Sequence, residues 1–105
     1  MPYISENDRQ ILDVTISHLV SKIYSTKYDI DKGYPKDFSK YLGAINYCFT
    51  RIITQVMMNV SYSNIAGATG VLENVKQELY RRLASKYEDQ KIVENGDIPE
   101  YKKWS

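Results

Sequence analysis

Hydrophobic residues recur every three or four positions in three stretches of the chain, the spacing that places side chains on one face of an α-helix. The first stretch runs from about Glu6 to about Ser25, and Ser5 stands before it as a candidate N-cap. The sequence therefore predicts an amphipathic helix here. Its apolar face consists of Leu12, Ile16, Leu19, Val20 and Ile23.

The second stretch runs from about Ser39 to about Asn59. Its other sides are also largely apolar, and a helix that is apolar on most sides is normally buried on most sides. Because one small chain cannot complete that burial easily, we expect a homo-oligomer, most simply a two-fold dimer packed through this helix. The core stripe of the helix is Leu42, Ile45, Phe49, Ile52 and Val56.

The third stretch is the longest, from about Asn64 to about Glu94, with Ser63 as its expected cap and Asn95-Gly96 as its end. No segment alternates with the period of a β-strand. The sequence thus predicts an all-α fold, a small three-helix domain over residues 1–97 with a long C-terminal helix. Residues 98–105 are predicted to form a polar, flexible tail.

A connector of about twelve residues, from Thr26 to Asp37, joins the first two helices. It carries tyrosines and charges of both signs, interrupted by Gly33 and Pro35. This length is unusual in a helical domain and is typical of a binding loop. The alternative is a surface crossover that packs its tyrosines on the helices.

Composition narrows the classes of function. The 105 residues include ten tyrosines, and 14 Lys plus Arg against 13 Asp plus Glu give a net charge of +1, which disfavours a dedicated nucleic-acid binder. Cys48 is the only cysteine and His18 the only histidine, so we expect no disulfide within the chain, no metal site and no cofactor. The N-terminal residues lack a signal-peptide pattern, and the stretch Ile45 to Val60 is too polar to span a membrane, so we expect a cytoplasmic protein.

Two pairs of tyrosine and arginine are the candidate ligand-binding residues: Tyr47 with Arg51, and Tyr80 with Arg82. An aromatic ring can stack on a base while a guanidinium pairs with phosphate oxygens. The alternative is that these residues form subunit interfaces, with ion pairs such as that of Arg82 with Glu78. No residues form a recognisable catalytic set, so the sequence predicts a protein without enzymatic activity.

Several segments resemble a family of small, uncharacterised bacteriophage and prophage proteins. They are MPYI at residues 1–4, NYCFTRII at 46–53, GVLENVKQELYRR at 70–82 and YEDQKIVENGD at 87–97. The connector does not share the resemblance. The resemblance implies no activity; it implies a phage origin and a site of action in the cytoplasm of the infected bacterium.

Two functions remain open at this point. The first is a helical homo-oligomer that sequesters a small anionic nucleotide-like ligand, a signal of host defence, in pockets where subunits meet. The second is an adaptor or inhibitor that binds a host or phage enzyme through its Tyr- and Arg-rich helical surface.

Overall fold

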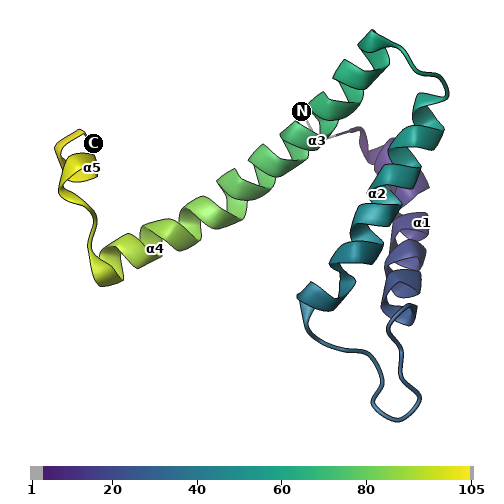
Figure 1. Ribbon diagram of the computed structural model, residues 1–105, viewed down its shortest axis with the longest axis horizontal. Helices are drawn as coiled ribbons and strands as arrows, with labels where there is room; N and C mark the ends of the chain where they lie inside the picture. Colours follow the sequence, from purple (N-terminus) through teal and green to yellow (C-terminus); the bar gives the residue numbers. More distant parts are fainter. Residues whose placement is uncertain (1–3, 105) are drawn as a thin grey trace. The chain divides into compact units, whose positions relative to one another are not determined.

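The computed structural model describes residues 4–104, and in these residues every regular element is a helix (Figure 1). The all-α fold is therefore confirmed. The chain divides into two compact units, residues 4–65 and residues 66–104, while the single domain over residues 1–97 stays a prediction. The elements are α1 (Glu6–Ser25), η1 (Phe38–Tyr41), α2 (Leu42–Met57), α3 (Tyr62–Leu79), η2 (Tyr80–Ala84), α4 (Ser85–Asn95) and α5 (Pro99–Trp104).

Helix α1 has the predicted bounds because its first turn is capped by a side chain. The Ser5 hydroxyl accepts a hydrogen bond from the backbone N–H of Asp8 at 3.2 Å, which satisfies one of the free donors of that turn. The predicted apolar face is only partly covered. Leu19 and Ile23 are half-buried, whereas Ile16 is 52% exposed.

The connector between α1 and η1 is an ordered, tightly closed loop. Asp29 and Gly33 form an isolated antiparallel bridge through two backbone hydrogen bonds of 2.9 and 2.7 Å. Inside the loop, the Asp29 carboxylate accepts from the backbone N–H groups of Asp31 and Lys32. Gly33 closes the turn with φ 76°, a conformation that glycine adopts without steric cost.

The second helix differs from its prediction at both ends. The expected start near Ser39 is a turn of 3₁₀-helix, η1, capped by the carboxylate of Asp37, and the α-helix begins only at Leu42. The helix ends at Met57 instead of Asn59. Met58 has φ 64° and ψ −50°, and the N–H of Asn59 donates to the carbonyl of Met57 at 2.7 Å, which together define a strained classic γ-turn.

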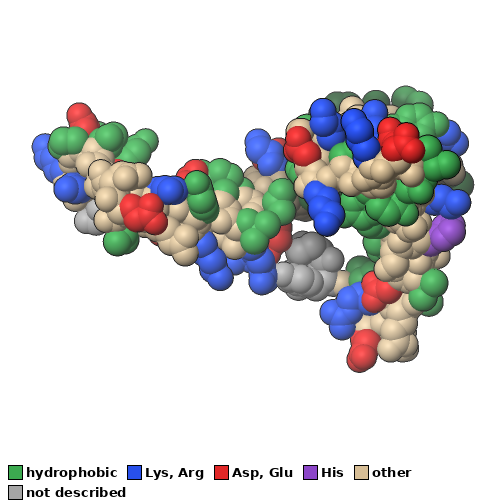
Figure 2. Space-filling model, turned by 90° about the horizontal axis from the view of Figure 1, so that it is seen from below, with side chains coloured by type: hydrophobic (Ala, Val, Ile, Leu, Met, Phe, Trp, Pro, Cys, Tyr) green, Lys and Arg blue, Asp and Glu red, His purple; other side chains and the backbone are tan. Residues whose placement is uncertain are grey.

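Residues 4–65 contain an open apolar groove of about 530 Å³ between α1 and α2. Among the described side chains only Tyr41 is buried, at 4% exposure, so the predicted core stripe of the second helix is not covered within one chain. Figure 2 shows hydrophobic side chains at the molecular surface. The groove is lined by Ile16, Leu19, Val20, Ile23, Tyr24, Phe38, Tyr41, Ile45, Cys48, Phe49 and Ile52.

The long C-terminal helix is confirmed, with one feature that its periodicity did not predict. Helical structure runs from Tyr62 to Asn95 as α3, η2 and α4, and η2 is a π-helical segment in which the N–H of Ser85 donates to the carbonyl of Tyr80. A π-helical turn rotates the residues after it relative to those before it, which the regular spacing of hydrophobic residues does not predict. The cap is Ser61, whose hydroxyl accepts from Asn64, and not Ser63 as predicted.

The end of α4 follows the sequence. Gly96 adopts φ 85°, and its N–H donates to the carbonyl of Ile92 at 2.8 Å. The following residues, Pro99–Trp104, form the short helix α5, where the sequence predicted a tail without regular structure. Ser105, the last residue of that tail, lies outside the described residues, and the flexibility of the tail stays a prediction.

Candidate functional site

The first predicted pair, Tyr47 and Arg51, is in contact on α2. The four-residue spacing places the two side chains one helical turn apart, and Arg51 Nη1 donates to the Tyr47 hydroxyl at 2.8 Å. The Arg51 guanidinium carbon also lies 5.7 Å from the centre of the Tyr47 ring, within cation–π range. Both residues are exposed, and within residues 4–104 Arg51 has no carboxylate in an ion pair.

In the second predicted pair, Tyr80 and Arg82 each form a hydrogen bond with a carboxylate and not with each other. The Tyr80 hydroxyl donates to the carboxylate of Glu88, at 2.8 and 2.9 Å from its two oxygens. The hydrogen bond and the negative charge of Glu88 raise the pKa of Tyr80 above its ordinary value. A negatively charged ligand at Tyr80 would therefore meet the charge of Glu88 first.

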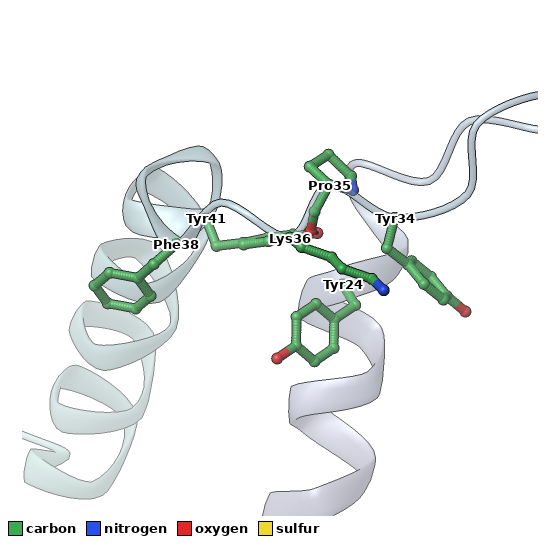
Figure 3. A pocket seen from close by; sticks show the side chains of 6 residues that line it. All are labelled: Tyr24, Tyr34, Pro35, Lys36, Phe38 and Tyr41. Atoms are coloured by element: carbon green, nitrogen blue, oxygen red, sulfur yellow. Dashed lines mark hydrogen bonds between the residues drawn. The ribbon is translucent and has the colours of Figure 1, made fainter.

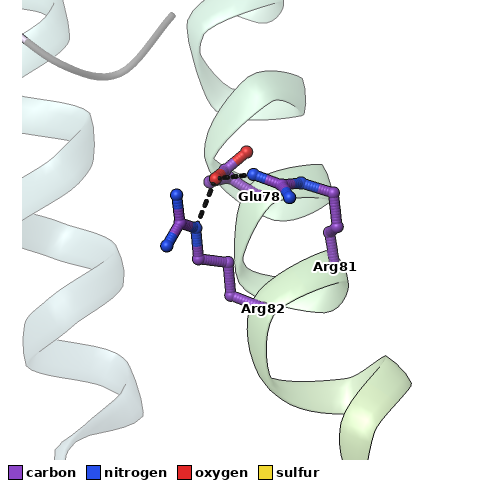
Figure 4. A network of polar contacts seen from close by, with 3 residues as sticks. All are labelled: Glu78, Arg81 and Arg82. Atoms are coloured by element: carbon purple, nitrogen blue, oxygen red, sulfur yellow. Dashed lines mark hydrogen bonds and ion pairs between the residues drawn. The ribbon is translucent and has the colours of Figure 1, made fainter.

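Arg82 is engaged by Glu78, as Figure 4 shows. Arg82 Nε lies 2.7 Å from Glu78 Oε1, and Arg81 Nη2 reaches the same oxygen at 2.5 Å. Hydrogen bonds from Arg82 and then Arg81 lower the pKa of the Glu78 carboxyl, which is thereby kept ionised. The ion pair between Arg82 and Glu78, which the sequence offered as the alternative to a ligand, is present.

The structure therefore separates the four candidate residues into two different environments. Tyr47 and Arg51 lie in the unit of residues 4–65 and form one contact without a carboxylate. Tyr80 and Arg82 lie in the unit of residues 66–104, and carboxylates of their own helix occupy both. Only the first pair presents an arginine whose charge is free for an anion.

A cluster of tyrosines lies at the ends of the connector, which the sequence indicated as a binding loop or a crossover without naming these residues together as a site. The Tyr24 ring contacts Tyr41 edge-on, with centroids 5.1 Å apart at 88°, and contacts Tyr34 at 6.0 Å. Tyr28 and Tyr34 flank the bridge of Asp29 with Gly33, which brings their centroids to 5.3 Å. The sequence feature that could have indicated this cluster is the local concentration of tyrosines, because four of the ten lie between positions 24 and 41.

Tyr41 anchors this cluster. Its hydroxyl donates to the carbonyl oxygen of Pro35 at 2.5 Å, which supplies the partner that a buried phenol needs. Burial, and then the neighbouring hydroxyls of Tyr24 and Tyr34, raise the pKa of Tyr41. The ring therefore stays neutral at physiological pH and fixes the connector against α1.

Two further features of the described residues concern metal binding and membrane spanning. Across the described residues, no group of three or more His, Cys, Asp or Glu side chains lies close enough to bind a metal ion. None of the helices within residues 4–104 combines the length and the apolar character that crossing a bilayer requires.

Comparisons with known proteins give a family and no activity. The chain belongs to a family described as a domain of unknown function, DUF6899, whose model matches residues 1–98. Membership of an uncharacterised family is thus confirmed, while the phage origin stays a prediction. No curated protein and no solved structure matches the chain.

Proposed function

We propose that this chain is a non-catalytic binding protein that assembles as a homo-oligomer and sequesters a small anionic nucleotide-like ligand. The observation that carries the proposal is the contact of Arg51 with the exposed Tyr47 ring, at 5.7 Å, with no carboxylate paired to the arginine in the described part of the chain. The ring offers a stacking face for a base, and the guanidinium retains donors for phosphate oxygens.

The assembly in this proposal is supported by the groove between α1 and α2. Apolar side chains from both helices line about 530 Å³ of open space, and a water-exposed surface of this kind is typical of an interface. A second copy placing its own helices on the groove would bury these side chains. Light scattering at micromolar concentration is expected to give a dimer or higher oligomer, and a monomer would contradict this part.

The proposal uses the two candidate pairs differently. Tyr47 and Arg51 hold the ligand near the subunit boundary. Tyr80 and Arg82 have a structural part, because an anion would first have to displace Glu78 or approach Glu88. The proposed place of action is the cytoplasm of an infected bacterium, supported by the resemblance of four sequence segments to phage and prophage proteins.

The test is a thermal-shift screen of the purified full chain with a panel of cyclic and linear nucleotides. A ligand present at about one hundred times its dissociation constant stabilises the folded state by roughly 2.7 kcal/mol. Arg51→Gln is expected to remove most of the shift, whereas Arg9→Gln, which removes an exposed arginine of α1, is the matched control and should leave it unchanged. No shift with any nucleotide, or equal losses in both variants, would reject the proposal.

A second function, an adaptor or inhibitor of a host or phage enzyme, is favoured by the same groove. In this case an apolar helix of the partner enzyme occupies the space between α1 and α2, and the exposed tyrosines act as interface anchors. A pulldown from infected cells separates the two functions. Stoichiometric recovery of one enzyme supports the adaptor, and recovery of the chain alone together with a nucleotide supports sequestration.

A further inference from the structure

A second concave site lies where the end of α1, the connector and η1 meet. It encloses about 500 Å³, within the range of small-molecule sites, and Figure 3 shows the side chains around it. In this view the Phe38 ring stands on the η1 side, and the rings of Tyr24 and Tyr34 stand on the α1 side. The lining residues are Tyr24, Tyr34, Pro35, Lys36, Phe38 and Tyr41.

The tyrosine side of this pocket is held in place by contacts that do not involve a ligand. Tyr41 is buried, packs edge-on against Tyr24 and donates to the carbonyl oxygen of Pro35. Tyr34 is fixed from two directions, by its ring contacts with Tyr24 and Tyr28. Because these three tyrosine rings already contact one another without a ligand, a planar ligand would lose little of its binding energy to ordering this side of the site.

The charge of the pocket selects the sign of its ligand. Lys36 is the one ionised side chain of the lining, no carboxylate lines the pocket, and Lys36 forms no ion pair in the part of the chain that the structure describes. A pocket with aromatic walls and no positive charge would suit an ammonium ligand, but the positive charge of Lys36 repels such a ligand. The same charge favours a ligand that carries an anionic group next to its ring.

We propose that this aromatic pocket binds a planar ring bearing an anionic group, of which a nucleoside monophosphate is the representative probe. Tyr24, Tyr34 and Phe38, which are 46%, 53% and 69% exposed, offer ring faces for stacking. Lys36 pairs with the anion. The site goes beyond the function proposed above, because one subunit supplies all of its residues and it uses neither Tyr47 nor Arg51. Tyr24, Phe38 and Tyr41 also line the groove between α1 and α2, so the site requires that a second copy in the groove leaves the pocket side of these rings open.

The experiment is a titration of the full chain with AMP, followed by two-dimensional NMR and by calorimetry. Adenosine and inorganic phosphate test the ring and the anion separately, and benzoate tests whether an aromatic carboxylate serves as well as a nucleotide. AMP is expected to shift the signals of Tyr24, Tyr34 and Phe38 and to bind about tenfold more tightly than adenosine. Phosphate alone is expected to leave these signals unchanged.

Matched variants make the result specific. Lys36→Gln should weaken AMP binding about tenfold and leave adenosine binding unchanged, whereas Lys27→Gln removes a connector lysine that does not line the pocket and should change neither. Phe38→Ala truncates an exposed wall and should weaken AMP and adenosine alike. Arg51→Gln should leave AMP binding here unaffected. Measuring the thermal shifts of the Arg51→Gln test in a chain that also carries Lys36→Gln removes the contribution of this site, which distinguishes its failure from failure of the proposed function.

Three outcomes would overturn the proposal. The first is the absence of AMP-induced shifts at Tyr24, Tyr34 and Phe38. The second is an equal effect of Lys36→Gln and Lys27→Gln, which would indicate unspecific attraction to the positive connector. The third is protection of the three rings in the oligomer without any nucleotide, which would mean that a second copy of the chain fills the space.

Discussion

The two units of the chain hold their tyrosines and arginines in opposite ways. In residues 4–65, tyrosine rings contact one another, and the Tyr47 ring contacts Arg51. The buried hydroxyl of Tyr41 donates to a backbone carbonyl and not to a carboxylate. In residues 66–104, Tyr80 donates to Glu88, and both Arg81 and Arg82 contact Glu78. The same residue types therefore leave positive charge available in the first unit and neutralise it in the second.

The difference comes from single carboxylates at helical spacing. Glu78 stands four residues before Arg82, which is the favourable order for an ion pair on one helix face. The residue four before Arg51 is Tyr47, and the residue four after it is Gln55. Placing an acidic residue at position 55 tests whether one carboxylate can convert the first environment into the second.

The largest expected effect concerns stability and tests whether the tyrosines of the first unit are structural. Tyr41→Ala removes the only buried side chain among the described residues and should cost about 3–5 kcal/mol, as for other buried aromatic truncations. Tyr80→Ala removes an exposed ring and should cost no more than about 1 kcal/mol. Hydrogen exchange measured by mass spectrometry reports the loss separately for residues 4–65 and 66–104.

Tyr41→Phe is the control for this comparison. It keeps the edge-on packing against Tyr24 and removes only the hydrogen bond to Pro35, so about 1 kcal/mol should be lost. Similar exchange rates in Tyr41→Ala and Tyr80→Ala would show that the two units do not differ in this respect.

A smaller effect is expected when the charges are exchanged between the two environments. Gln55→Glu places a carboxylate one turn after Arg51 and should weaken nucleotide binding about fivefold, since two charges about 4 Å apart in water interact by about 1 kcal/mol. Glu78→Gln removes the negative charge that Arg81 contacts and should add weak anion binding at Arg81 in the second unit. Calorimetric titration of both variants with the nucleotide found by screening measures the two changes.

Gln55→Ala is the matched control, because it alters the same position without adding charge. If Gln55→Ala weakens binding as much as Gln55→Glu, the effect lies in packing and the electrostatic contrast between the units is wrong. If Glu78→Gln adds no anion binding at Arg81, neutralisation by Glu78 is not what distinguishes Arg81 from Arg51.

The sequence predicted those structural features that depend on residues close together in the chain. Ser5 and Gly96 mark the ends of helical segments because each acts on backbone groups within four residues, and Tyr47 meets Arg51 because they lie one turn apart. The tyrosine cluster depends on closure of the connector by Asp29 and Gly33, which periodicity does not report. The γ-turn at Met58 likewise follows no local preference, because a positive φ there favours glycine.

The smallest expected effect is a difference in how acid acts on the two units. The pKa of Glu78 is lowered by Arg82 and Arg81, and that of Asp37 is lowered by its hydrogen bonds with Ser39. A carboxyl whose folded pKa is lowered contributes its full stability above the unfolded value, and this is lost as pH falls through the folded value. The unfolded values are 4.5 for Glu78 and 3.8 for Asp37, so the helix around Glu78 should begin to weaken at a higher pH than η1.

Urea unfolding at each pH between pH 6 and pH 3, followed through the backbone signals of each segment, measures this order. Glu78→Gln should remove the pH dependence around η2 and leave that of η1 intact, since Asp37 caps η1 independently. High salt should reduce the effect at Glu78, because the Arg81 and Arg82 side chains are exposed and their charges are screened. If η1 loosens first, or if both segments respond in Glu78→Gln as in the original chain, charge pairing is not what holds the second unit's arginines.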